Sequence, residues 1–142
     1  MKVGQVLAHL RQLEHGLADS LRSAADRHSD DHDVFHQCRT FAATATARTE
    51  TLDRIRDRYA GDAEWSSAIS GESDDLLEDL RSLYLRLQEV AITWEMAAQA
   101  AKAARDKDLI ALSTASHSEA EAQAKWIQTR IKTSAPQALV VA

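Results

Sequence analysis

The 142-residue sequence predicts an all-α protein built as a four-helix bundle, and three observations support this fold class. The chain has only four glycines and one proline, whereas an all-β domain needs turn residues at short intervals. Hydrophobic residues make up 44% of the chain and aromatic residues 5%. Apolar residues recur at steps of three and four along four segments, as in amphipathic helices. A chain of this length can bury roughly two thirds of its unfolded surface, so we expect residues 1–142 to form one domain.

The first predicted helix covers residues 2–28, and one acidic residue lies within its apolar face. Glu14 shares this face with leucines before and after it. Because a buried carboxylate needs a partner, we expect either a metal ion near it, or a basic side chain, or the hydroxyls of Thr49, Ser113 or Ser116. The apolar positions of this helix are Val3, Val6, Leu7, Leu10, Leu13, Leu17, Leu21 and Ala24.

The second predicted helix covers residues 31–60. Its start is indicated by "RHSDDHDV", in which Asp30 and Asp33 have the spacing of a capping box. Gly61 is a natural stop for the helix. The apolar positions are Val34, Cys38, Phe41, Ala42, Ala45, Thr49, Leu52, Ile55 and Tyr59.

Two further helices are predicted at residues 73–104 and 107–134, followed by an apolar tail at 135–142. The segment "GDAEWSSAISGES" before them has no periodicity and contains two glycines, which indicates a loop. We expect a turn at Asp106 or Asp108. Neither Gly nor Pro marks that turn, so one continuous helix of about 60 residues, roughly 90 Å long, is the alternative. The main apolar positions are Leu76, Leu80, Leu83, Leu87, Val90, Ala91, Trp94, Ala98 and Ala101, then Leu109, Leu112, Ser113, Ser116, Ala120, Ala124, Ile127 and Ile131.

The connection lengths indicate two antiparallel hairpins joined by a longer link. Roughly a dozen residues at about 3.3 Å each span on the order of 40 Å, close to the length of one helix. The chain resembles the ferritin-like superfamily from "LEHGLADSLRSAADRH" through "RTETLDRIRDRYAG" to "WEMAAQAAKAARDKDLIALSTASHSEAEAQAKWIQTRIK". The resemblance implies an antiparallel four-helix bundle with a long crossover between the second and third helices. An up-down bundle with a decorated loop is the alternative, because the length permits a crossover without requiring it.

The sequence lacks the ligand pattern that di-iron members of that superfamily use. They take a Glu from each of two helices and a Glu-x-x-His from each of the other two, and no Glu-x-x-His occurs here. We therefore expect no intact di-iron site and no cofactor. The alternative is a metal-binding oxidoreductase or metal-handling protein that holds a single divalent ion of iron, manganese or zinc. Its ligands would be Glu14, Glu95, His117 and Glu121.

The residues that could form a second metal site or a catalytic nucleophile are weaker candidates than these four. His28, His32 and His36 are spaced by four and could chelate Zn²⁺ or Ni²⁺, although a solvated, helix-capping corner is the preferred interpretation. Cys38 lies among apolar residues and is expected to be a buried small hydrophobe. Ser113 and Ser116 lie near His117, but no loop suited to an oxyanion hole is visible. No catalytic residue is predicted.

Charge and hydropathy limit the classes of partner and the cellular location that we expect. The net charge of −5 and a pI near 5.6 disfavour nucleic acid, which needs clustered basic residues. No window approaches 18 uncharged apolar residues, so no membrane-spanning segment is expected. The N-terminal residues have charges and a histidine where a secretory signal needs an apolar core. We expect a cytoplasmic protein.

The third helix has a second apolar face in addition to its main one. Leu85, Ile92 and Met96 recur at steps of seven and four, with Glu89 between them. A four-helix bundle buries only one face of each helix, and exposed apolar faces commonly bind partners. We therefore expect a structural or protein-interaction module that self-associates, as a homodimer or higher oligomer, through these four residues. The alternatives are cover by the loop with Trp65 and Ile69, or a different protein partner.

Overall fold

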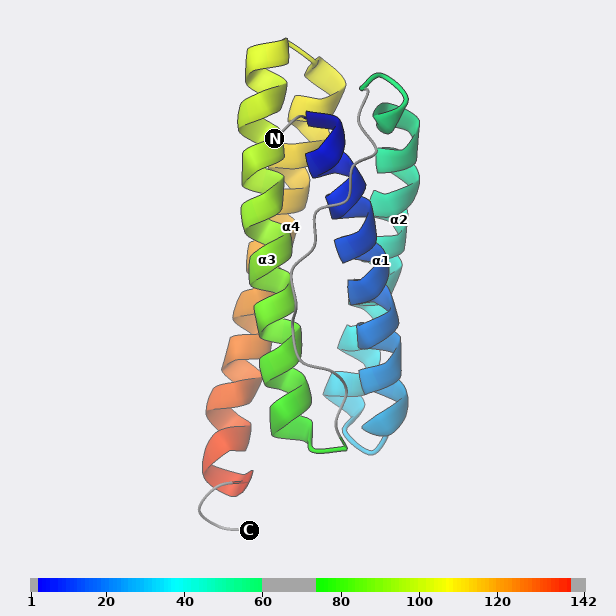
Figure 1. The fold of residues 1–142 in the computed structure, drawn as a ribbon. Coiled ribbons are helices and arrows are strands. Elements are labelled where there is room, and N and C mark those ends of the chain that lie inside the picture. Colours follow the sequence, from blue (N-terminus) through cyan, green and yellow to red (C-terminus); the bar gives the residue numbers. More distant parts are fainter. Residues whose placement is uncertain (1–2, 60–73, 139–142) are drawn as a thin grey trace.

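The computed structural model describes residues 3–59 and 74–138, and the regular secondary structure in those ranges is entirely helical (Figure 1). Four helices follow one another along the chain: α1 (Val3–Arg27), α2 (His32–Arg56), α3 (Leu76–Ala104) and α4 (Lys107–Pro136). The helix α1 packs against α2 and α3, and α4 packs mainly against α3 and also against α2. The prediction of an all-helical protein with four helices is therefore confirmed.

The core lies between the four helices and is formed largely by leucine and alanine. Trp94 of α3 is the largest fully buried side chain among the described residues. Most predicted apolar positions are buried, whereas several positions, such as Leu13 and Phe41, are only partly buried and pack against the core from its edge. No helix within the described ranges combines the length and the apolar character needed to cross a membrane. Fully buried core residues from the four helices include Leu7, Leu10, Leu17, Leu21, Leu52, Leu80, Leu87, Leu109 and Ile127.

The boundaries of α2 differ from the predicted ones. The N-cap is Asp31, which has an extended backbone and accepts a hydrogen bond from the backbone N–H of Val34 at 3.1 Å. The prediction that Asp30 begins a capping box is therefore wrong by one residue. The helix ends at Arg56, before the predicted residue 60, and Asp57 is its C-cap. Gly61, the predicted stop, lies outside the described residues.

The turn between α3 and α4 is at the predicted place. Arg105 has a φ of 54°, in the left-handed region, which ends α3. Asp106 is the N-cap of α4 and accepts a hydrogen bond from the backbone N–H of Leu109 at 3.1 Å. The alternative of one continuous long helix is wrong. The helix α4 continues through Pro136, two residues past the predicted end. Proline has no backbone N–H to donate to the carbonyl four residues earlier.

Polar contacts between helix ends show which ends meet. The guanidinium of Arg58, just after α2, contacts Asp106 and Asp108 at the start of α4 at 2.9 and 2.6 Å. At the other end of the bundle, Arg27 at the end of α1 donates to Asp79 near the start of α3. The end of α2 and the start of α3 therefore lie at opposite ends of the molecule (Figure 1).

Candidate functional site

A charged cluster lies in the middle of the core, where three helices meet. Glu14 of α1 is fully buried, and its Oε1 atom accepts hydrogen bonds from Nε of Arg48 on α2 at 2.7 Å and from Nε1 of Trp94 on α3 at 2.8 Å. The side chain of Arg48 is only 4% exposed. We call these three residues the buried polar cluster.

The fourth helix connects the buried polar cluster to the surface. Nη1 of Arg48 donates to Oε2 of Glu119 on α4 at 2.9 Å, and the side chain of Glu119 is 51% exposed. The other guanidinium nitrogen of Arg48, Nη2, and the Oε2 atom of Glu14 have no hydrogen-bond partner among the described residues. The guanidinium therefore bridges one buried and one solvated carboxylate.

Burial dominates the protonation of Glu14. Removal from water raises the pKa of this carboxyl above its ordinary value, because the charged form loses its hydration. The charge of Arg48 and the hydrogen bonds from Arg48 and Trp94 oppose the rise in the pKa without cancelling it. Desolvation is thus the larger effect in this part of the core.

The expectation that Glu14 has a basic partner is confirmed, but the partner was not identified from the sequence. The hydroxyl of Thr49 donates to the backbone oxygen of Ala45 instead. Arg48 was missed because an arginine within an apolar series is usually taken for a surface residue. The spacing could have revealed it: Arg48 follows Ala45 by three residues and precedes Leu52 by four, so it lies on the apolar face of α2.

The four predicted metal ligands lie in two places. Nε2 of His117 lies 3.7 Å from Oε2 of Glu95 and 3.5 Å from Oε1 of Glu121, on the outside of α3 and α4. Glu14 is in the core, bonded to Arg48. Within the described ranges, no group of three or more His, Cys, Asp or Glu residues is arranged to hold a metal ion. The structure brings together three of the four residues but not Glu14, and metal binding stays a prediction.

The predicted histidine run is divided by the α1–α2 turn. His28 is largely buried, and its Nε2 atom lies 2.8 Å from Oδ2 of Asp79, which also accepts from Arg27. His32 and His36 are exposed on α2, with stacked rings whose centroids are 6.4 Å apart. His28 therefore belongs to a contact between helix ends, and only the other two share a surface.

Cys38 has the environment predicted for it. The side chain is fully buried, and burial, with smaller contributions from the charges of Asp31 and Asp79, raises the pKa of the thiol to about 12. A thiol with such a pKa is poorly reactive, because the thiolate is the nucleophile. Cys38 therefore acts as a small hydrophobic residue.

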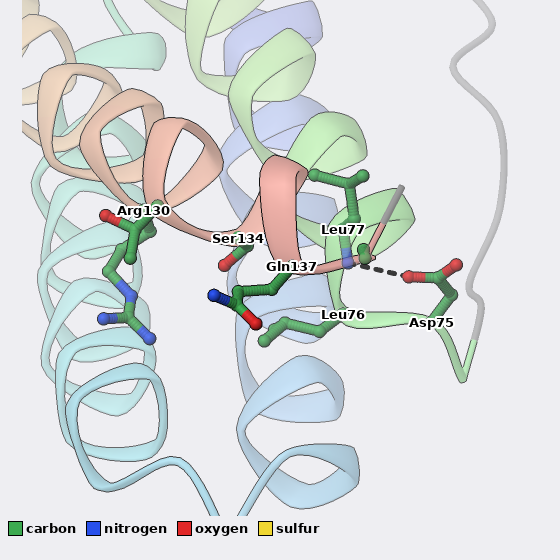
Figure 2. Close-up of a pocket in the computed structure, with 8 residues that line it drawn as sticks. Asp75, Leu76, Leu77, Arg130, Ser134 and Gln137 are labelled. Atoms are coloured by element: carbon green, nitrogen blue, oxygen red, sulfur yellow. Dashed lines mark hydrogen bonds between the residues drawn. The ribbon is translucent and has the colours of Figure 1, made fainter. Parts of the chain in front are cut away.

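A pocket of about 420 Å³ opens near the C-terminal end of α4, beside the start of α3 (Figure 2). Its two charged residues already have partners: Arg130 donates to Asp31, the N-cap of α2, and Asp75 accepts from the backbone N–H of Leu77 at 2.9 Å. The lining residues are Asp75, Leu76, Leu77, Arg130, Thr133, Ser134, Gln137 and Ala138.

The predicted second apolar face of α3 is smaller than expected. The side chains of Leu85 and Ile92 are 37% and 54% exposed, whereas Met96 packs against the core and Glu89 lies 3.6 Å from His9. At about 100° per residue, Glu89 and Met96 lie about 60° and 40° from Ile92 around the helix, toward the bundle. The exposed side, which we call the α3 outer face, consists of Glu78, Arg81, Leu85, Gln88, Ile92, Glu95 and Gln99.

Comparison with known proteins identifies no relative. No protein-family model matches the chain, and neither the curated proteins nor the solved structures contain a significant match.

Proposed function

We propose that this protein is a self-associating helical-bundle module that acts through protein contacts on the α3 outer face. The observation that carries the proposal is the exposure of Leu85 and Ile92, the only large hydrophobic side chains that are exposed in the described part of the chain. The two residues are seven positions apart, so they lie two turns apart on one line of the helix. Full burial of a side chain of this size is worth about 1.5–3 kcal/mol, which favours a partner on this face.

The proposal includes the ferritin-like connectivity. The contact of Arg58 with Asp106 and that of Arg27 with Asp79 support antiparallel neighbours in the pairs α2/α4 and α1/α3. A long crossover between α2 and α3 would join ends that lie at opposite ends of the bundle. A cytoplasmic location is also part of the proposal, since a free, buried Cys38 suits a reducing compartment.

The buried polar cluster supports a structural role for the interior. In a metal site the carboxylate of Glu14 would face a cation supplied from outside, whereas Arg48 already supplies a positive charge at 2.7 Å. The alternative function, a metal-dependent oxidoreductase or metal-handling protein, needs Glu14 beside Glu95, His117 and Glu121. Nothing in the packing brings these four residues together.

The test is the molar mass in solution, measured by size-exclusion chromatography with light scattering over a series of concentrations. We expect the mass to rise with concentration from 15.7 kDa toward twice that value. The variant Ile92→Glu should stay monomeric and keep its helical circular dichroism, because Ile92 is 54% exposed and contributes little to the core.

The control is Ala47→Glu, which adds the same charge at an exposed position of α2, a helix that packs against α1 and α4. This variant should associate like the unmodified protein. A wild type that is monomeric at every concentration would overturn the proposal. A dimer that Ile92→Glu leaves intact would reject the α3 outer face as its interface.

A further inference from the structure

We propose that the partner on the α3 outer face is a second copy of this chain, related by a two-fold axis near Gln88, with the two α3 helices antiparallel. This inference rests on the proposed function and adds to it the orientation and register of the second copy. It is carried by the order of apolar and charged residues along the α3 outer face.

The exposed apolar residues can meet in either orientation of a symmetric pair, because in a parallel pair Leu85 and Ile92 would each face their own copies. In an antiparallel pair with a two-fold axis, Leu85 of one copy lies opposite Ile92 of the other, and the reverse contact follows by symmetry. Residues whose numbers add up to about 177 then face each other. Gln88 lies beside the axis, so the two apolar contacts flank it symmetrically.

The charges on the α3 outer face agree with that register. Arg81 of one copy comes within one residue, about 1.5 Å along the helix, of the position opposite Glu95 of the other. In a parallel pair with the same centre, each residue would face its own copy, so Arg81 would meet Arg81 and Glu95 would meet Glu95. Like charges directly opposite each other destabilise an interface, and the charge order therefore selects the antiparallel pair.

Both charged residues are available for this contact. Arg81 is exposed, and the side chain of Glu95 is 54% exposed. The contact of Glu95 with His117 has an O–N distance of 3.7 Å, which is too long for a hydrogen bond. Glu95 can therefore turn to a guanidinium on the second copy without losing a strong bond in its own chain.

The size of the face predicts a reversible association. The stretch from Glu78 to Gln99 is roughly 33 Å long at 1.5 Å per residue. Near the centre of this stretch, each copy contributes two exposed apolar side chains, those of Leu85 and Ile92. Interfaces below about 1,200 Å² of total buried area are typical of transient complexes. We therefore expect a dimer whose population depends on concentration.

Disulfide trapping of single-cysteine variants tests the orientation. Gln88→Cys should form a covalent dimer under mild oxidation, because position 88 lies next to its own copy across the axis. Arg81→Cys should not, because the two copies of position 81 would be about 22 Å apart along the paired helices, beyond the Cα separation of about 7 Å that a disulfide allows. The native Cys38 is fully buried and does not compete.

The control for trapping is Ala47→Cys on the exposed side of α2, which should stay monomeric under the same oxidation. Covalent dimers of Arg81→Cys at the level of Gln88→Cys would overturn the antiparallel orientation. That outcome is distinguishable from failure of the proposed function, which would appear as a wild type that never exceeds the monomer mass.

A charge exchange gives a second measurement. Arg81→Glu should weaken dimerisation roughly 2- to 30-fold, since two symmetric surface pairs are lost and each is worth about 0.2–1 kcal/mol. The double variant Arg81→Glu/Glu95→Arg should restore the dissociation constant, because the same pairs form with their charges exchanged. A double variant that dimerises no better than Arg81→Glu alone would contradict the register.

Discussion

The centre of the bundle and its α2–α4 end both hold an arginine against a carboxylate, and the two contacts have nearly the same length. Nε of Arg48 lies 2.7 Å from Glu14 in the centre, and Nη2 of Arg58 lies 2.6 Å from Asp108 at the end. Their exposure differs greatly: the side chains are 4% and 0% exposed in the first pair and 46% and 69% in the second. Water competes for the charged groups of the Arg58–Asp108 pair and not for those of the Arg48–Glu14 pair. The distance between the two atoms alone therefore does not measure how much a contact contributes to stability.

The pKa values of Glu14 and Asp106, one carboxyl group from each region, are shifted in opposite directions. In the centre, burial raises the pKa of Glu14. At the α2–α4 end, the hydrogen bond from the backbone of Leu109, followed by that from Tyr59, lowers the pKa of Asp106. Desolvation outweighs the hydrogen bonds at Glu14, whose side chain is 0% exposed, whereas the hydrogen bonds outweigh desolvation at Asp106, whose side chain is 11% exposed.

The largest expected effect is the loss of the buried pair. Glu14→Ala should lower the free energy of unfolding by about 3–5 kcal/mol, because it leaves the guanidinium of Arg48 buried without its main partner. Urea denaturation followed by circular dichroism measures this loss. Replacing both residues, as in Glu14→Leu/Arg48→Met, removes the charge as well as its partner and should recover most of the stability. A double variant as unstable as Glu14→Ala would show that the pair itself, rather than an orphaned charge, stabilises the centre.

A smaller effect is expected at the α2–α4 end. Asp106→Ala should cost about 1 kcal/mol, the usual value for an N-cap residue, because the backbone N–H of Leu109 loses its acceptor. Arg58→Ala should cost less than Asp106→Ala, since Arg58 is exposed. The same urea titrations compare the variants. If Arg58→Ala were as destabilising as Glu14→Ala, burial would not be what separates the two regions.

The smallest expected effect is a difference between Glu14 and Asp106 in how their contributions to the free energy of unfolding change with pH. Glu14 has a raised pKa in the folded state, so its contribution is fully present below its ordinary value of 4.5 and is lost as the pH rises through the raised value. Asp106 has a lowered pKa, so its contribution is fully present above its ordinary value of 3.8 and is lost as the pH falls.

The stability differences from two isosteric variants separate these contributions. The stability of the wild type relative to Glu14→Gln should decrease with rising pH above 4.5, and that relative to Asp106→Asn should decrease with falling pH below 3.8. Urea denaturation at a series of pH values measures both slopes. If both stability differences changed with pH in the same direction, desolvation would not dominate at Glu14 while hydrogen bonding dominates at Asp106.

Much of the fold could be predicted because the relevant signals are local. The spacing of Leu10, Leu17 and Leu21 predicts a helix and its inward face. The turn at Asp106 has no such local signal, and it was expected because a continuous helix of about 60 residues is too long for a compact chain of this size. The ends were less predictable: Asp30 and Asp31 are equally good caps by residue type, and only the backbone conformation at Asp31 distinguishes them.

The candidate site was predictable only in part. Glu14 stands out because a carboxylate in an apolar series needs a partner, but its partners Arg48 and Trp94 are 34 and 80 residues away in the sequence. Nothing in the local pattern of α1 identifies them. The grouping of Glu95, His117 and Glu121 without Glu14 likewise depends on which helices are neighbours.

The sequence by itself determined four amphipathic helices, their approximate limits and the presence of a charged residue among the core leucines, because helical periodicity and capping act over a few residues. Only the tertiary structure decided that Arg48 is the partner of Glu14, and that Ile92 is exposed while Met96 packs against the core. Those outcomes depend on how the helices are rotated against one another, which is fixed by packing between segments far apart in the chain.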